Sequence, residues 1–405
     1  MSHRLTLVVV GGGAAGFFSS VIAAQKAPDC RVILLEKSKQ LLTKVKLSGG
    51  GRCNVTHACF DPKQLVLNYP RGHKALLGPF SRFQPTHTIE WFKQRGVTLK
   101  TEKDGRMFPI TDSSETIANC LLKAAQEHGV EIRTSTGLNH IAPSSTGFTL
   151  TLGNNETLSC DRLLLASGSN TKVWELLKGL GPTIVPPVPS LFTFNVPNFT
   201  LAELSGISIL QVHTKLKECD LEQTGPLLIT HWGFSGPAIL KLSAWGARVL
   251  HDRHYEATLQ INWLPNMTQN ELKERLLEYK ALHPARLVTS EGFDSLPRNL
   301  WKKLIEKAGG SSELRWSHLS KALLQKIIQE ISSCEFEIRG KSTYKEEFVT
   351  CGGVALSEVD FKRMESKLHP HLHFAGEILD IDGVTGGFNF QNAWTTGFIA
   401  AEAML

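Results

Sequence analysis

The chain has 405 residues and a formal net charge of +6, with 41% hydrophobic and 20% charged residues. This length exceeds what one hydrophobic core usually serves, so two or three domains are expected, and this composition excludes a disordered or fibrous protein. The eight cysteines contain no C-x-x-C pair, which argues against a disulfide framework and a zinc site, so we expect no metal and a reducing, cytoplasmic location.

The uncharged stretch 5–25 resembles a signal anchor in length, but its sequence argues against that role. Only six of its residues precede the triple glycine, which is too few for the apolar region of a signal peptide. No later segment offers an uncharged span of bilayer length. We therefore expect no membrane helix.

Residues 5–37 carry the pattern of a nucleotide-binding unit. Apolar residues ending at Val10 run into Gly11, Gly13 and Gly16 in G-x-G-x-x-G spacing, followed by an expected helix 14–27 and strand 31–35. The glycines permit a tight turn, close approach of a pyrophosphate and close helix packing, and an acid twenty residues past the last glycine suits a ribose. The predicted cofactor contacts here are Gly11, Gly13, Ala14, Ala15, Gly16, Glu36 and Lys37.

A second glycine-rich loop, KLSGGGRCNVTH, occupies 46–57. Consecutive glycines expose backbone N–H groups to a phosphate or the edge of a flavin, although a plain flexible turn is the alternative interpretation. The predicted cofactor contacts here are Lys44, Gly50, Gly51, Arg52, Cys53 and Asn54. Five residues separate Cys53 from Cys59, so on a helix the two thiols would face different ways; we expect no redox-active pair and a buried Cys59.

Charge is unevenly distributed along the chain. Residues 37–89 contain nine Lys or Arg against one acid, Asp61. This excess is either a solvated face or an electropositive mouth for an anionic substrate, a nicotinamide phosphate or RNA.

Residues 85–168 continue the α/β pattern. Helices are expected at 88–95 and 114–128, and strands at 131–135 and 163–166, with a hairpin turning at 154–155 between them. Arg106, in the loop 105–109, either contacts substrate or pairs with a carboxylate. Ser167 and Gly168 follow the last strand and are further predicted cofactor contacts.

The middle of the chain has a different pattern of predicted elements. A proline-rich boundary after Gly181 leads into short strands at 207–210, 211–216, 227–230 and 257–261, which suggest a small barrel. Ser235, Gly236 and Pro237 open a helix, and 268–332 is helical with mixed charges. We interpret this region as an insertion.

The C-terminal segment returns to glycine-rich chemistry. A strand at 373–375 precedes Gly376 and Glu377, whose carboxylate suits a ribityl chain. Gly386, Gly387, Phe388 and Asn389 precede a final helix to Met404, whose N-terminal dipole can stabilise negative charge on a reduced flavin. All six residues are predicted cofactor contacts.

At these motifs the chain resembles the BaiN-type family of FAD-dependent oxidoreductases, also called aminoacetone-oxidase-family or NAD(FAD)-utilizing flavoproteins. The resemblance spans nearly the whole chain through GGGAAG, KLSGGGRCNVT, GRMFP, THWGFSGPAIL, CGGVALSEVD, ESKL and FAGEILDIDGVTGGFNFQNAW. It implies an α/β fold with a Rossmann-like FAD domain of the two-dinucleotide-binding-domain type, interrupted by a β-barrel and a helical subdomain. The expected boundaries are 1–186 with 347–405, 187–267 with 333–346, and 268–332.

The resemblance implies FAD as cofactor and leaves the substrate open. Our leading hypothesis is an oxidoreductase whose flavin accepts a hydride from NAD(P)H and passes it to a substrate double bond. The alternatives are an amine oxidase that uses oxygen, a flavoenzyme that reduces uridine in RNA, and a non-catalytic flavin- and nucleic-acid-binding protein. His57, where the family often has Asn, and Arg106 are the catalytic candidates; a structural role for His57 is the alternative.

Overall fold

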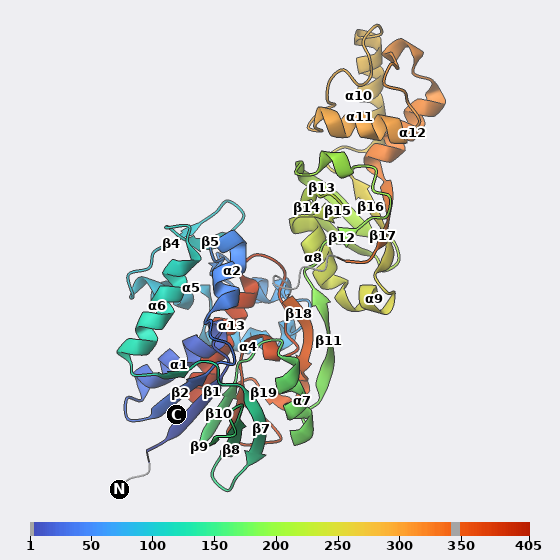
Figure 1. The fold of residues 1–405 in the computed structure, drawn as a ribbon. Coiled ribbons are helices and arrows are strands. Elements are labelled where there is room, and N and C mark those ends of the chain that lie inside the picture. The colour runs from blue at the N-terminus through green and yellow to red at the C-terminus, as the bar shows by residue number, and fades with distance from the viewer. Residues whose placement is uncertain (1–3, 342–348) are drawn as a thin grey trace. The chain divides into compact units, whose positions relative to one another are not determined.

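The computed structural model describes residues 4–341 and 349–405. The chain divides into two compact units, one comprising Met1–Ser190 with Lys345–Leu405 and the other Leu191–Tyr344 (Figure 1). We call them the first and the second unit and describe each by itself.

A seven-stranded sheet forms the centre of the first unit. Its five parallel strands lie in the order β6 (Glu131–Arg133), β2 (Arg31–Leu35), β1 (Thr6–Val10), β10 (Arg162–Leu165) and β21 (Leu372–Phe374). The short strands β20 (Glu365–Ser366) and β19 (Val359–Asp360) extend it antiparallel at one edge. The strand order reverses between β1 and β10, which is where open α/β sheets bind ligands at the carboxyl ends of their strands. The predicted α/β, Rossmann-type fold is confirmed.

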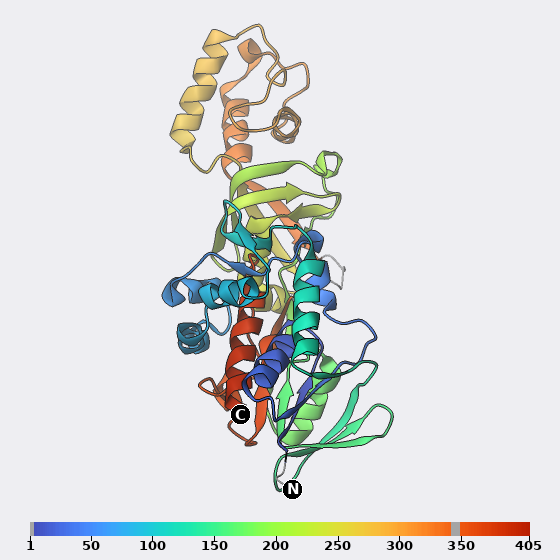
Figure 2. The ribbon, with the colours of Figure 1, turned by 90° about the vertical axis from the view of Figure 1, so that its left-hand side faces the viewer.

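Helix α1 (Ala14–Lys26) is buried on all sides between its neighbours. It packs against α13 (Phe388–Ala403) and α6 (Ser114–Glu127), so the first and last helices of the chain lie side by side (Figure 2). The Phe18 ring of α1 lies 5.4 Å from the Trp394 ring of α13. Because the two chain ends share this core, the N-terminal and C-terminal glycine motifs belong to one unit.

The remaining elements of the first unit flank this core. Two further sheets consist of β3 (Thr56–His57), β5 (Arg106–Pro109) and β4 (Leu99–Thr101), and of β7 (Leu138–Pro143), β8 (Phe148–Leu152) and β9 (Thr157–Cys160). A ribbon pairs β11 (Ile184–Ser190) with β18 (Val349–Val354). The other helices are α2 (Thr43–Gly51), α3 (Pro62–Leu65), α4 (His73–Arg82), α5 (Pro85–Lys93) and α7 (Thr171–Leu180).

The second unit is built on a six-stranded antiparallel sheet. Its order is β12 (Phe194–Asn195), β15 (Gly233–Ser235), β14 (Leu221–Ile229), β13 (Ser208–Leu216), β16 (Glu256–Asn262) and β17 (Cys334–Arg339), with α8 (Pro237–Trp245) and α9 (Ala247–Asp252) beside it. A bridge between Phe194 and Lys341 brings its two edges together. The two strands expected at 207–210 and 211–216 are one strand, β13, because a bulge between Ile209 and Val212 shifts its register without ending it.

A helical segment lies between β16 and β17 in the chain. It contains α10 (Gln269–Leu282), α11 (Arg298–Lys307) and α12 (Lys321–Ser332). Thr268 and Glu271 form a capping box at the start of α10, and Ser320 caps α12. The Trp301 indole donates to the carbonyl of Val288 over 2.7 Å, which ties α11 to the loop before it.

The described residues form neither a membrane-spanning helix nor a cluster of metal ligands. No helix in 4–341 or 349–405 is long and apolar enough to cross a membrane. The same residues bring no three His, Cys, Asp or Glu side chains into an arrangement that could hold a metal ion.

Candidate functional site

The first glycine turn lies at the carboxyl end of β1, against the end of β10. Gly11 has φ +118°, and a Cβ there would lie 2.4 Å from the carbonyl oxygen of Ala166. A Cβ at Gly16 would lie 1.8 Å from the carbonyl oxygen of Gly11. Glycine is therefore required at both positions by conformation or packing alone.

Gly13 differs from these two glycines. It precedes α1 with φ −96°, a conformation open to any residue, and a Cβ there would meet no atom of the described residues within 4 Å. Ala14 and Ala15 follow as the first residues of α1. The first N–H groups of a helix have no partner within the helix, so this N-terminus, with open space at the Gly13 Cβ position, is suited to an anion.

Glu36 directly follows β2 and lies beside this turn. Its carboxylate accepts hydrogen bonds from the N–H groups of Gly12 (2.7 Å) and Ser38 (2.8 Å). Each carboxylate oxygen keeps further acceptor capacity for a ligand. Lys37 is exposed next to it. The predicted ribose acceptor thus also fixes the glycine turn.

The second glycine loop has left-handed backbone at three successive residues. Gly49, Gly50 and Gly51 have φ of +60°, +66° and +80°, so the last turn of α2 is a loop in conformation. A Cβ at Gly50 or Gly51 would enter open space among the described residues, whereas one at Gly49 would lie 3.0 Å from the ring of Phe108. The loop therefore packs on Phe108 at Gly49 and is open at Gly50 and Gly51.

Arg52 and Arg106 both pair with Glu102 beside this loop. The Glu102 carboxylate accepts from Arg52 Nη1 (2.7 Å) and from Arg106 Nη2 (3.0 Å), and Arg106 Nε also donates to Asp104 (2.7 Å). The guanidinium of Arg52 lies 4.0 Å from the centre of the Phe108 ring. Hydrogen bonding to Glu102 raises the pKa of Arg52. Of the two interpretations of Arg106, the structure shows carboxylate pairing.

His57 and the start of α13 meet at the neighbouring strand. His57 is the register partner of Arg106, and its ring stacks on Phe388 at 4.6 Å. His57 Nε2 lies 3.1 Å from the carbonyl oxygen of Asp104, an acceptor only, so this nitrogen carries a proton. A Cβ at Gly105 would lie 2.4 Å from the same ring. The histidine is held between Gly105 and Phe388.

The glycines before α13 are fixed by side chains from both chain ends. In the amide orientation that satisfies both of its ends, Asn54 accepts from the N–H of Gly387 (2.9 Å). Asn389 exchanges two hydrogen bonds of 2.8 Å with the backbone of Gly383. A Cβ at Gly386 would lie 2.7 Å from the ring of Phe388. These contacts fix the backbone of the loop that leads into α13.

Helix α13 carries buried polar side chains that the sequence interpretation missed. Gln391 accepts from the hydroxyls of Thr56 (2.6 Å) and Thr88 (3.0 Å), and the Trp394 indole donates to the carbonyl of Val55 (2.9 Å). Thr395 donates to the carbonyl of Phe83 (2.9 Å). Gln391, Trp394 and Thr395 are three and four residues apart, so they lie on one face of the helix. This spacing was the sequence signal for them, because polar groups on a buried helix face are normally hydrogen-bonded.

Lys44 and Glu377 form an ion pair that joins α2 to the short helix η5 (Gly376–Ile378). The other oxygen of Glu377 accepts from the N–H of Thr350 (2.9 Å). A Cβ at Gly168 would lie 3.5 Å from this carboxylate. The neighbouring hydroxyl of Ser167 is buried without a hydrogen-bond partner among the described residues. Predicted contacts from three distant segments are thus adjacent.

Arg71 forms a structural ion pair with a buried carboxylate. Its guanidinium pairs with Asp382, which is 0% exposed and also accepts from the Ser190 hydroxyl (2.6 Å). Burial raises the pKa of the Asp382 carboxyl, against the effect of Arg71. At least four other bases of 37–89 pair with acids from outside that segment: Lys44, Lys46, Arg52 and Arg82. The local charge excess is therefore smaller than the sequence suggests.

The cysteines near the loop are free thiols. Burial raises the pKa of Cys53 to about 12, so its thiol stays protonated at neutral pH. Cys59, expected to be buried, is half-buried, and the segment between the two is not helical.

We expect Cys59→Ser to leave flavin reduction and turnover at wild-type values, with a stability change within about 0.5 kcal/mol, because Cys59 is partly solvated. Anaerobic titration with a reductant checks this, and Cys219→Ser in the second unit is the control. A charge-transfer band that is present in wild type and absent from Cys59→Ser would establish a disulfide mechanism instead.

Comparison with known proteins settles the family. The family described as HI0933-like protein Rossmann domain matches residues 5–403. This chain belongs to that family. It is an FAD-dependent oxidoreductase, as the sequence motifs predict.

Two relatives align over nearly their whole length. The ribosomal RNA dihydrouridine synthase of Escherichia coli (strain K12) is 28% identical, over 100% of this chain and 98% of that protein. The 3-dehydro-bile acid delta(4,6)-reductase of Clostridium scindens is 26% identical, over 98% of each.

A solved structure shares the fold. The 3-ketosteroid delta1-dehydrogenase from Sterolibacterium denitrificans superposes with a TM-score of 0.52 at 12% identity, covering 98% of this chain and 99% of that one.

Proposed function

We propose that the protein binds FAD at the carboxyl ends of β1 and β10 and reduces a ring carbon–carbon double bond that is conjugated to a carbonyl group. Gly13 is the observation that carries the FAD site. Its φ of −96° and the open space around its Cβ position give no structural reason for glycine. A backbone-lined approach for a pyrophosphate supplies that reason.

The residues around this turn fit the cofactor. The buried Ser167 hydroxyl has no described partner, and Gly50 and Gly51 leave a second open backbone surface. We assign the pyrophosphate to the N-terminus of α1, the adenosine ribose to Glu36, and the ribityl chain to Glu377. The other assigned contacts are Lys37, Lys44, Gly50, Gly51, Arg52, Cys53, Asn54, Ser167, Gly168, Gly376, Gly386, Gly387, Phe388 and Asn389.

The chain's own groups orient the chemistry that the cofactor supplies. Bound FAD supplies two-electron hydride transfer. The α13 N-terminus offers positive dipole to an anionic flavin ring, and the contacts of Asn54 and Asn389 hold it in place. His57, whose ring stacks on Phe388 at the start of α13, is the candidate proton donor.

The names of the two relatives favour one reaction class. Forming dihydrouridine and reducing a delta(4,6) bile acid both saturate a ring double bond conjugated to a carbonyl. Uridine in RNA is our first proposed substrate, with NAD(P)H as the hydride source. A small ring enone is the second.

Anaerobic flavin spectroscopy tests this function. We expect NADH or NADPH to bleach the bound flavin, and uridine-containing RNA to restore its absorbance with formation of dihydrouridine. Restoration by a conjugated ring ketone alone would select the second substrate. Bleaching by an aminoacetone-type amine, with restoration only by oxygen, would contradict the proposal and favour an amine oxidase.

A further inference from the structure

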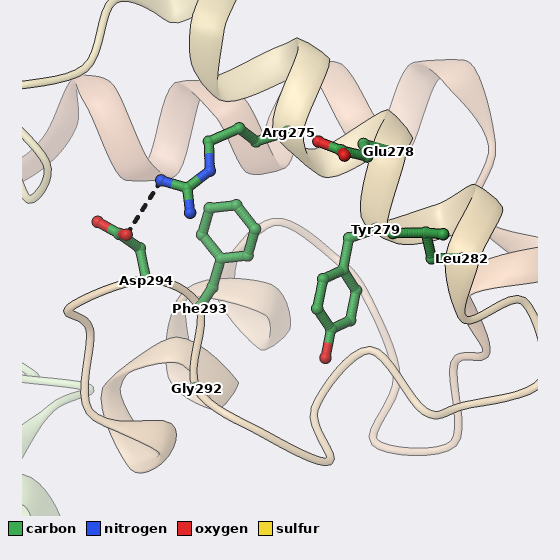
Figure 3. Close-up of a pocket in the computed structure, with 7 residues that line it drawn as sticks. All are labelled: Arg275, Glu278, Tyr279, Leu282, Gly292, Phe293 and Asp294. Carbon is green, nitrogen blue, oxygen red and sulfur yellow. Dashed lines mark hydrogen bonds and ion pairs between the residues drawn. The ribbon is translucent and has the colours of Figure 1, made fainter.

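The second unit contains a pocket of about 160 Å³ on its helical segment, which we call the α10 pocket (Figure 3). One wall comes from α10 at helical spacing, and the other from the loop before α11. The lining residues are Arg275, Glu278, Tyr279, Leu282, Gly292, Phe293 and Asp294.

The aromatic walls of the α10 pocket are held from outside. The Phe293 ring stacks on Trp301 at 5.1 Å, and the Tyr279 ring lies 5.1 Å from Trp316. The Tyr279 hydroxyl donates to Glu291 over 2.9 Å. Gly292 packs so closely that a Cβ there would lie 2.5 Å from the carbonyl oxygen of Leu296. The walls are therefore positioned before any ligand arrives, which lowers the entropic cost of binding.

The charged groups at the opening favour hydrogen-bond donors. Arg275 donates to Asp294 over 3.0 Å and lies 5.8 Å above the Phe293 ring, as Figure 3 shows. The carboxylate of Glu278 is exposed at the rim. Two carboxylates against one guanidinium repel a phosphate group inside the pocket, and they accept hydrogen bonds from amino groups.

The volume of the pocket and the charge of the surrounding segment restrict the class of ligand further. Pockets for whole drug-sized ligands measure about 300–1,000 Å³, so this one accommodates a single small ring system. The helical segment 268–332 has eleven Lys and Arg against eight Asp and Glu. A neutral ring inside the pocket and a phosphate backbone outside it match this distribution.

We propose that the α10 pocket holds one unpaired nucleobase of an RNA, and that the base carries an exocyclic amino group. The inference rests on RNA as the substrate class of the proposed function. Adenine, cytosine and guanine can donate from that amino group to Glu278 or Asp294, while the aromatic rings stack on the base. Uracil has no exocyclic amino group and donates only through its ring N3–H, so we expect the pocket to prefer the other three bases and to anchor RNA rather than select the uridine that reacts.

An arginine side chain of a basic protein is the competing occupant. The guanidinium of Arg275 already lies over Phe293, and the helical segment has net positive charge. The first feature fills the cation–π position on the Phe293 ring, and the second disfavours the approach of a basic protein to the segment as a whole. The nucleobase is therefore the better match.

Equilibrium binding of RNA homopolymers tests the proposal. Labelled oligo(A), oligo(C) and oligo(U) of equal length are titrated with the whole chain in the absence of NAD(P)H, and binding is followed by fluorescence anisotropy. We expect oligo(A) and oligo(C) to bind more tightly than oligo(U). Tyr279→Leu should weaken oligo(A) and oligo(C) binding about 5- to 150-fold, the range for loss of one base–aromatic stack, and should weaken oligo(U) binding less, because uracil also stacks but lacks the amino group. Circular dichroism confirms that the variant is folded.

Two acidic positions on α10 give a matched comparison. Glu274 and Glu278 are both exposed, but only Glu278 lines the α10 pocket. Glu278→Ala should weaken oligo(A) and oligo(C) binding through loss of an acceptor, whereas Glu274→Ala should leave all three unchanged or strengthen them through loss of repulsion.

Equal binding of the three oligonucleotides, unaffected by Tyr279→Leu and Glu278→Ala, would overturn the inference. Saturable binding of an arginine-containing peptide that requires Glu278, without base preference, would overturn it in favour of a protein partner. Reduction of uridine is assayed separately. Catalysis that fails while base-selective binding persists contradicts the proposed function, and the reverse result contradicts the pocket.

Discussion

Gly13→Val is expected to raise the dissociation constant for FAD at least about 100-fold, or about 2.8 kcal/mol, and to leave the apo fold intact. The Cβ position at Gly13 meets no described atom within 4 Å, so valine has room in the protein. That room is the path by which we propose the pyrophosphate reaches the N–H groups of α1. Flavin content after purification and a titration of the apoprotein with FAD measure the effect.

The neighbouring glycine provides the control for this prediction. Gly16→Val should lower stability itself, because a Cβ at that position would lie 1.8 Å from the carbonyl oxygen of Gly11. Thermal melting of the two apoproteins separates the effects. Wild-type flavin stoichiometry in Gly13→Val would place the cofactor somewhere other than this turn.

Arg71→Met should destabilise the protein by about 3–5 kcal/mol, because it leaves the fully buried Asp382 carboxylate without its cation. Arg82→Met is the matched control, since Arg82 pairs with Glu402 at the surface and such pairs contribute about 0–1 kcal/mol. Denaturant unfolding of both variants measures the difference. A further change of Asp382→Leu in the Arg71→Met background should restore most of the loss.

The pH dependence of the Arg71→Met variant has a definite sign. Burial raises the pKa of Asp382 in the folded protein, and removing Arg71 raises it further. The folded state then binds a proton more tightly than the unfolded chain, whose Asp pKa is about 3.9. The variant should therefore regain stability relative to wild type as the pH falls through the folded pKa toward that value. A deficit that is constant with pH would show that the buried charge is not the cause.

Local sequence was sufficient to predict the first glycine turn and the elements on either side of it. The turn was predictable because conformation and close packing restrict Gly11 and Gly16 to glycine within a short segment, and we propose that access for the cofactor restricts Gly13. Strand β2 appears at the predicted residues, and α1 differs by one residue at its end. Continuous apolar runs identify strands that are buried on both faces. The oxidoreductase class was predicted by a different route, from the resemblance of the sequence motifs to a known family.

Only the tertiary structure decided which side chains are available to a ligand. In the sequence, Arg71 and Lys44 belong to a basic segment that is either a solvated face or an electropositive mouth, and Lys44 is a predicted cofactor contact. In the structure they pair with Asp382 and Glu377, which lie more than 300 positions away. The pairing of Arg52 with Glu102 and the contact between Gly49 and Phe108 likewise depend on how β5 and the turn before it fold against the glycine loop. Backbone conformation is set by neighbouring residues along the chain, whereas charge pairing and burial are set by contacts between distant segments. The glycine turn was therefore fixed by sequence, and the electrostatics around it by the fold.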